Sequence, residues 1–94
     1  MKTYYLSKSS RKNKKYMVKS EGNPTIHFGD SRYSDYTIHK DEDRKKRYIL
    51  RHRMREDWSD PQTAGFWSYH LLWSKPTIYE SIQSLKTKGI SIIY

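Results

Sequence analysis

The chain contains no cysteine, which excludes disulfide bonds and metal sites built on thiolates. It also lacks any apolar run near the roughly 18 to 20 residues that a membrane-spanning helix requires. Its N-terminal segment, MKTYYLSKSSRKNKK, has no apolar stretch of the kind found in a secretory signal peptide. These absences lead us to expect a protein that is made in the cytoplasm and carries no membrane anchor.

Acidic residues are scarce relative to basic ones. There are 10 Asp and Glu against 19 Lys and Arg, giving a formal net charge of +9 over 94 residues. That length predicts a single small basic domain spanning residues 1–94. Such an excess of positive charge favours an acidic partner, which could be nucleic acid, an anionic lipid surface or the acidic face of another protein.

Aliphatic residues are also few, because hydrophobic residues make up only 34% of the chain, whereas aromatic residues reach 15%. The core must therefore depend on large aromatic side chains, each of which buries about 150–250 Å². The predicted core residues are Tyr48, Phe66, Trp67, Trp73, Ile78, Ile82 and Leu85.

Short β-prone runs flank turn-forming residues in the first third of the chain. Residues 16–19 and 25–28 surround a Gly-Asn-Pro cluster and predict a hairpin. Residues 3–6 are a candidate third strand, residues 1–15 form a basic arm or a hairpin tip, and residues 36–38 are expected to be extended. The apolar C-terminal run at 90–94 predicts a last strand added to the same sheet.

Three helices are expected between these strands. The first covers residues 41–56 with Asp41 as its N-cap. The second begins at Asp60-Pro61 and places Phe66, His70 and Trp73 on one face, with Tyr69 and Leu72 outward. The third follows the capping box that starts at Thr77. The predicted fold class is therefore α+β, with a small antiparallel sheet, made of an N-terminal hairpin and a C-terminal strand, packed against about three helices.

Basic residues concentrate in the first helix and the N-terminal segment. Lys and Arg around a helix can neutralise several phosphates. The alternative is a solvated helix face with internal charge pairs, but few carboxylates are near enough in sequence to pair. The residues predicted to contact an acidic partner or nucleic acid are Arg11, Lys12, Lys14, Lys15, Arg44, Lys45, Arg47, Arg51 and Arg53.

Three tyrosines are candidates for contacts with a partner: Tyr33, Tyr36 and Tyr69. The first two flank a loop rich in Ser and Asp, where they could stack on nucleic-acid bases or anchor a protein interface.

Catalytic and metal-binding signatures are not found. The spacing of the four histidines, at positions 27, 39, 52 and 70, fits no zinc pattern, and the sequence has no phosphate-binding loop or nucleophile elbow. We therefore expect no enzymatic activity, no metal, no cofactor and no small-molecule substrate.

Several segments together resemble a family. These are TIHFG (25–29), YTIHKD (36–41), YILRH (48–52), TAGFWS (63–68) and LLWSKPT (71–77). The pattern, over roughly residues 15–82, is similar to a small, functionally uncharacterised family encoded by nucleocytoplasmic large DNA viruses. At Tyr69 the chain departs from it, since the family carries a basic residue there. The resemblance implies a viral setting, with synthesis in the host cytoplasm and a place in the virion.

Two functions follow from the resemblance and the charge together. The first is a minor capsid or cement protein that binds larger viral capsid proteins, with inner-membrane headgroups as further acidic neighbours. The alternative is a DNA-binding protein without sequence specificity that acts in genome packaging.

Overall fold

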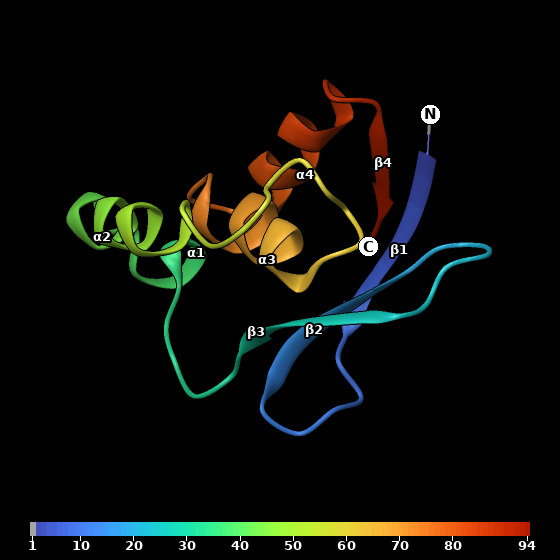
Figure 1. Cartoon of the computed structure of the whole chain (residues 1–94), viewed down its shortest axis with the longest axis horizontal. Helices are drawn as coiled ribbons and strands as arrows, with labels where there is room; N and C mark the ends of the chain where they lie inside the picture. The colour runs from blue at the N-terminus through green and yellow to red at the C-terminus, as the bar shows by residue number, and fades with distance from the viewer. Residues whose placement is uncertain (1) are drawn as a thin grey trace.

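The computed structural model describes residues 2–94, which form a four-stranded sheet with helices on one of its faces (Figure 1). The strands are β1 (Lys2–Lys8), β2 (Lys14–Lys19), β3 (Ile26–Asp30) and β4 (Ile90–Ile93), in the spatial order β3-β2-β1-β4. The α+β class predicted from the sequence is confirmed, as is the joining of the C-terminal strand to the N-terminal ones.

Three of the strands pair antiparallel. Leu6 lies opposite Val18 in the β1–β2 hairpin, and Val18 lies opposite Ile26 in the hairpin around the Gly-Asn-Pro turn. The basic N-terminal segment therefore contains a strand and a hairpin turn at residues 9–13.

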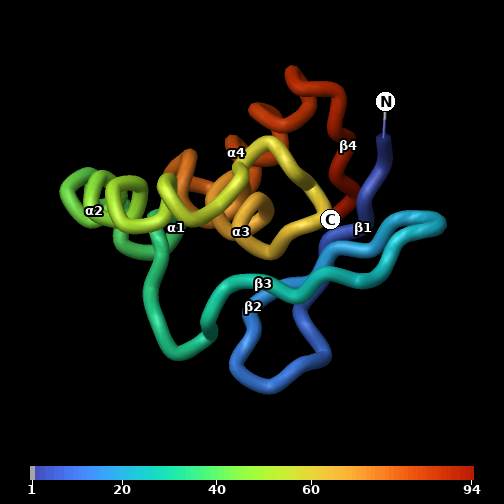
Figure 2. The backbone as a smooth tube through the Cα atoms, viewed as in Figure 1, coloured from blue at the N-terminus to red at the C-terminus, as the bar shows by residue number. Residues whose placement is uncertain are grey.

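The last strand differs from the antiparallel arrangement expected, because β4 runs parallel to β1, with Tyr4 opposite Ile92. Figure 2 shows the two strands side by side, with β4 reached from the end of α4. A parallel neighbour needs a long crossover connection, and here the crossover is the entire chain between β1 and β4.

The helical segments are α1 (Tyr36–His39), α2 (Glu42–His52), α3 (Ala64–Trp67), a π-helical turn η1 (Ser68–Trp73) and α4 (Ile78–Lys86). Asp41 caps α2 by accepting hydrogen bonds from the amides of Asp43 and Arg44, as predicted. Thr77 likewise caps α4 by accepting from the Glu80 amide. None of the helices formed by residues 2–94 is long and apolar enough to cross a bilayer.

Two local predictions were wrong. Residues 36–38 are helical because the Asp35 carboxylate accepts the Thr37 amide and so starts a helical turn. The second helix starts later than Asp60-Pro61, because Thr63 is its N-cap. The Asp60 carboxylate instead accepts the amide of Gln62 within the preceding turn.

The core lies between the sheet and the segment formed by α3, η1 and α4. It contains the predicted residues Phe66, Trp67 and Leu85, against which Trp73, Ile78 and Ile82 pack half-buried. The sheet contributes Tyr4, Leu6, Val18 and Phe28. The Tyr4 ring meets Trp67 edge to face at 4.7 Å, one of the favoured aromatic geometries.

The π-helical turn changes which side chains face this core. The amide of Ser74 donates to the Tyr69 carbonyl, so residues five apart lie on one face. Phe66 and Leu71 form one such pair, and Trp67 and Leu72 form another. Leu72, predicted to point outward, is only 1% exposed, because a wide turn brings both leucines onto the sheet.

Candidate basic cleft

A cleft of about 800 Å³ lies between α2 and the ends of β2 and β3. Five basic side chains line it, namely Lys14, Arg44, Arg47, Arg51 and Arg55. Its other lining residues include Phe28, Asp30, Tyr33, Tyr48, Glu56, Ser68 and Trp73. We call this feature the basic cleft.

Helical spacing explains why four arginines face the same cavity. Arg44, Arg47, Arg51 and Arg55 follow one another at intervals of three or four residues, which places them along one side of a helix and its last turn. All four, like Lys14, are exposed. Among residues 2–94 the ion pairs are Lys15–Asp35, Arg32–Asp30 and His52–Glu56, so none of the five cleft cations takes part in one.

The two carboxylates at the cleft are engaged by other groups. Asp30 accepts Nε and Nη2 of Arg32 at 3.0 and 2.8 Å, and these hydrogen bonds lower the pKa of Asp30 to about 2. Glu56 accepts the Trp58 indole N–H at 2.9 Å and pairs with His52 Nδ1 at 3.2 Å. The carboxylates at the cleft therefore form no ion pair with its five cations, although Lys14 lies opposite Asp30 in the β2–β3 register.

An aromatic stack supports α2 beneath the cleft. Tyr48 packs nearly parallel to Trp73, with ring centroids 4.3 Å apart, and stacks on His52 at 4.2 Å. Trp58 stacks on Tyr69 at 4.0 Å. Burial raises the pKa of Tyr48 to about 12, so its hydroxyl stays neutral. The π-helical turn places Ser68 and Trp73, five residues apart, together at the cleft.

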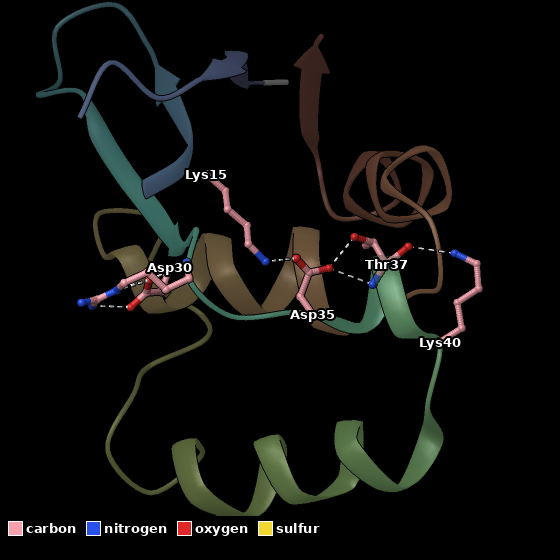
Figure 3. Close-up of polar contacts among 6 residues, drawn as sticks. Lys15, Asp30, Asp35, Thr37 and Lys40 are labelled. Atoms are coloured by element: carbon pink, nitrogen blue, oxygen red, sulfur yellow. Dashed lines mark hydrogen bonds and ion pairs between the residues drawn. The ribbon is translucent and has the colours of Figure 1, made fainter. Parts of the chain in front are cut away.

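Three lysines hold the surrounding segments together, and Figure 3 shows two of them, Lys15 and Lys40. Lys15, on β2, forms a buried ion pair with Asp35, whose carboxylate also accepts from Thr37. Lys40 donates to the carbonyls of Thr37 and Pro76, both at 2.8 Å. Lys45 donates to the Ser74 carbonyl at 2.7 Å and so ties α2 to the end of η1.

The nine residues predicted to contact an acidic partner do not all lie on one surface of the folded protein. Lys14, Arg44, Arg47 and Arg51 meet at the cleft, while Arg11 and Lys12 lie exposed in the β1–β2 turn and Arg53 lies exposed just after α2. Lys15 and Lys45 must be corrected, because their ammonium groups are taken up by Asp35 and Ser74. Arg55 was missed, although its spacing of four from Arg51 is the signal that could have found it.

The three tyrosines predicted as contacts differ in exposure. Tyr33 lies at the cleft and is 69% exposed. Tyr36 was wrongly predicted as a contact, because its ring is buried and its hydroxyl donates to Glu42 at 2.7 Å. Tyr69 is half-buried against Trp58, which leaves only part of its ring for a partner.

The histidines serve local packing within residues 2–94, where no group of three or more His, Asp or Glu side chains is placed to hold a metal ion. His70 Nε2 lies 2.8 Å from the Trp58 carbonyl, and burial lowers the pKa of His70. The neutral ring therefore donates its Nε2–H to that carbonyl. His39 Nδ1 accepts the Asp41 amide at 2.9 Å, next to the start of α2.

Comparison with known proteins gives one match. Residues 4–52 match the Family of unknown function (DUF5754), a segment that runs from β1 through α2 and carries four of the five cleft cations. No curated protein and no solved structure matches the chain. Since the matched segment is just over half of the sequence, the chain belongs to the Family of unknown function (DUF5754).

Proposed function

We propose that this protein binds nucleic acid through the phosphate backbone, in the basic cleft and without catalysis. The observation that carries the proposal is the set of five exposed cleft cations, none of which forms an ion pair within residues 2–94. Unpaired cations gathered on one surface release counterions from a nucleic acid when they neutralise its phosphates.

The geometry favours binding without sequence specificity. Base readout requires side chains aimed at base edges, in most cases from a helix lying in the major groove. In α2 the arginine row of Arg44, Arg47 and Arg51 lines a cavity together with residues of β2 and β3, an arrangement that suits contacts to phosphates more than base readout from a helix in a groove. The cleft carboxylates, Asp30 and Glu56, are held by Arg32, His52 and Trp58, which supports binding rather than acid–base chemistry.

Equilibrium titration of a labelled oligonucleotide, followed by fluorescence anisotropy, tests this function. The affinity should fall steeply with salt, with log K against log[salt] showing a slope of about −3 or steeper if the cleft cations each meet a phosphate. Substitutions that change the base sequence should leave the affinity within about threefold. No binding to any oligonucleotide at about 100 mM salt would eliminate the proposal.

A second candidate function is a minor structural protein of a large DNA virus particle, bound to larger capsid proteins. It is favoured by the sheet face that the helices leave uncovered, where Tyr5 and Ile93 lie opposite each other in register and are 54% and 51% exposed. Exposed aromatic and aliphatic side chains next to one another are typical of contact sites on a protein surface.

Proteomics of purified virus particles tests the structural role. A cement protein should be present at a copy number fixed by the capsid lattice, and Tyr5→Ser with Ile93→Ser should reduce its retention in the particle. Absence from the particles would rule this role out. It would leave nucleic-acid binding as the function to be tested.

A further inference from the structure

We infer that the nucleic acid taken by the basic cleft is single-stranded and that one of its bases stacks on Tyr33. This inference rests on the proposed function, because it names the class of ligand for the same cleft. It is carried by the shape of the cleft, by the position of its cations and by the exposure of Tyr33.

The size of the cleft favours a single strand over a duplex as the ligand that lies inside it. A volume of about 800 Å³ is that of a site for a drug-sized ligand, so it has room for about one or two nucleotides. A duplex is a stiff rod with its phosphates on the outside, so it can touch exposed cations at the rim but is too wide to lie within the cavity. A single strand is flexible enough to enter and follow the row.

The cations lie along a line that suits such a strand. From Arg44 to Arg51 the row spans roughly 10 Å at the rise of an α-helix, Arg55 follows in the next turn, and Lys14 lines the cleft from β2. The phosphate backbone of a single strand lying in the cleft would thus contact cations from both α2 and β2. Basic grooves of this kind, combined with aromatic side chains, are how proteins bind single strands without sequence preference.

Tyr33 has the properties of a base-stacking residue. Its ring is 69% exposed at the cleft and stacks on no other aromatic ring of the described chain. The turn beneath it is fixed, because the Tyr33 amide donates to the Asp30 carbonyl at 3.1 Å and the Arg32 amide to the Asp30 carboxylate at 2.9 Å. The turn is therefore fixed beside the cations, and most of the Tyr33 side chain remains open to a base.

The test compares a labelled single strand of about 12 nucleotides with a duplex of the same length, at about 100 mM salt. We expect the wild-type protein to bind the single strand at least about tenfold more tightly. Tyr33→Ala should weaken single-strand binding by roughly 5- to 100-fold, while Tyr33→Phe should retain it. Tyr79→Ala is the matched control, because Tyr79 is 71% exposed and lies outside the cleft.

The outcomes separate this inference from the function on which it rests. Equal or tighter binding of the duplex, or an unchanged affinity of Tyr33→Ala, would overturn the single-strand inference and leave backbone binding intact. Equal competition by a poly-glutamate peptide, with no dependence on Tyr33, would overturn it in favour of an acidic protein segment. Failure to bind either oligonucleotide would overturn both proposals.

Discussion

Single residues decide how closely the sheet and the helical segment approach each other. Gly29 has a φ of 77°, and a Cβ at this position would lie 2.7 Å from Leu72 Cδ1 and 3.3 Å from Lys15 Cβ. The contact depends on the π-helical turn, because that turn brings Leu72 onto β3. A glycine in strand β3 is therefore required both by the backbone conformation and by the packing of η1.

Gly29→Ala should accordingly destabilise the domain more than the same change at Gly22. Both glycines have a φ of 77°, but a Cβ at Gly22 meets nothing within 4 Å, so Gly22→Ala measures the backbone strain alone. Because the added methyl group overpacks against Leu72, Gly29→Ala should lose about 1–3 kcal/mol more of the free energy of unfolding than Gly22→Ala loses. Urea denaturation measures both variants, and equal losses would show that β3 and η1 are not in close contact.

The half-buried histidine at position 70 predicts a loss of stability in mild acid. Burial lowers the pKa of His70 in the folded state, so below its ordinary value of 6.5 the unfolded chain binds more protons than the folded one. Stability is thus fully present above about pH 6.5 and is lost as the pH falls towards the lower folded pKa. His70→Gln, which cannot titrate, should show a weaker fall in urea midpoint between about pH 7 and pH 5.

Some of this dependence should survive in His70→Gln, because burial also lowers the pKa of His39. An identical pH dependence in the wild type and in His70→Gln would contradict a half-buried, neutral His70. The donor to the Trp58 carbonyl can be supplied by the glutamine amide, so the variant should remain folded at neutral pH.

Secondary-structure elements could be predicted from the sequence where their signals are local. The Gly-Asn-Pro hairpin and the caps at Asp41 and Thr77 each depend on a few adjacent residues, and these predictions are confirmed. The π-helical turn depends on two apolar pairs, Phe66-Trp67 and Leu71-Leu72, meeting the same sheet. Its five-residue repeat is visible in the sequence, but a regular helix of 3.6 residues per turn was the expectation.

Long-range pairing limited what could be predicted of the cleft. Lys14 and Lys15 are adjacent and chemically identical, yet one lines the cleft and the other forms an ion pair with Asp35. Successive residues of a strand point to opposite faces, and the sequence does not say which face meets a distant carboxylate. The arginine row of α2 could be predicted, because spacings of three and four residues place these side chains on one side of a helix.

The contribution of the Thr77 N-cap to the stability of helix α4 can be tested by substitution. Its side-chain oxygen accepts the Glu80 amide at 3.0 Å and so starts α4, the helix that carries Leu85 into the core and leads to β4. Thr77→Ala should lower the free energy of unfolding by about 1 kcal/mol, as measured by urea denaturation. Thr77→Ser retains the oxygen and should stay near the wild type; an equal loss in both would show that the capping bond is not what stabilises α4.

The whole molecule combines a thin aliphatic core with a large excess of positive charge. Aromatic side chains fill the space between sheet and helices, and the stack of Tyr48 and His52 with Trp73 holds the basic helix against η1. The family match ends with α2, whereas Ser68 and Trp73 come from η1. The cleft therefore exists only in the folded domain as a whole.

The central claim, that nucleic acid binds in the basic cleft, is tested most directly by two double variants that lose the same charge at different places. Arg47→Ala with Arg51→Ala removes two cleft cations, and Lys86→Ala with Lys88→Ala removes two exposed cations outside the cleft. Each pair lowers the formal net charge from +9 by two, so the two variants differ in where charge is lost. Circular dichroism should show both to be folded.

The measurement is the salt dependence of single-strand binding by these two double variants. The cleft pair should weaken binding and reduce the slope of log K against log[salt] by about 1.4, since each phosphate contact on a single strand contributes about 0.7. The control pair should leave the slope close to that of the wild type. Equal reductions in both variants, or no reduction in the cleft pair, would contradict the assignment of nucleic-acid binding to the basic cleft.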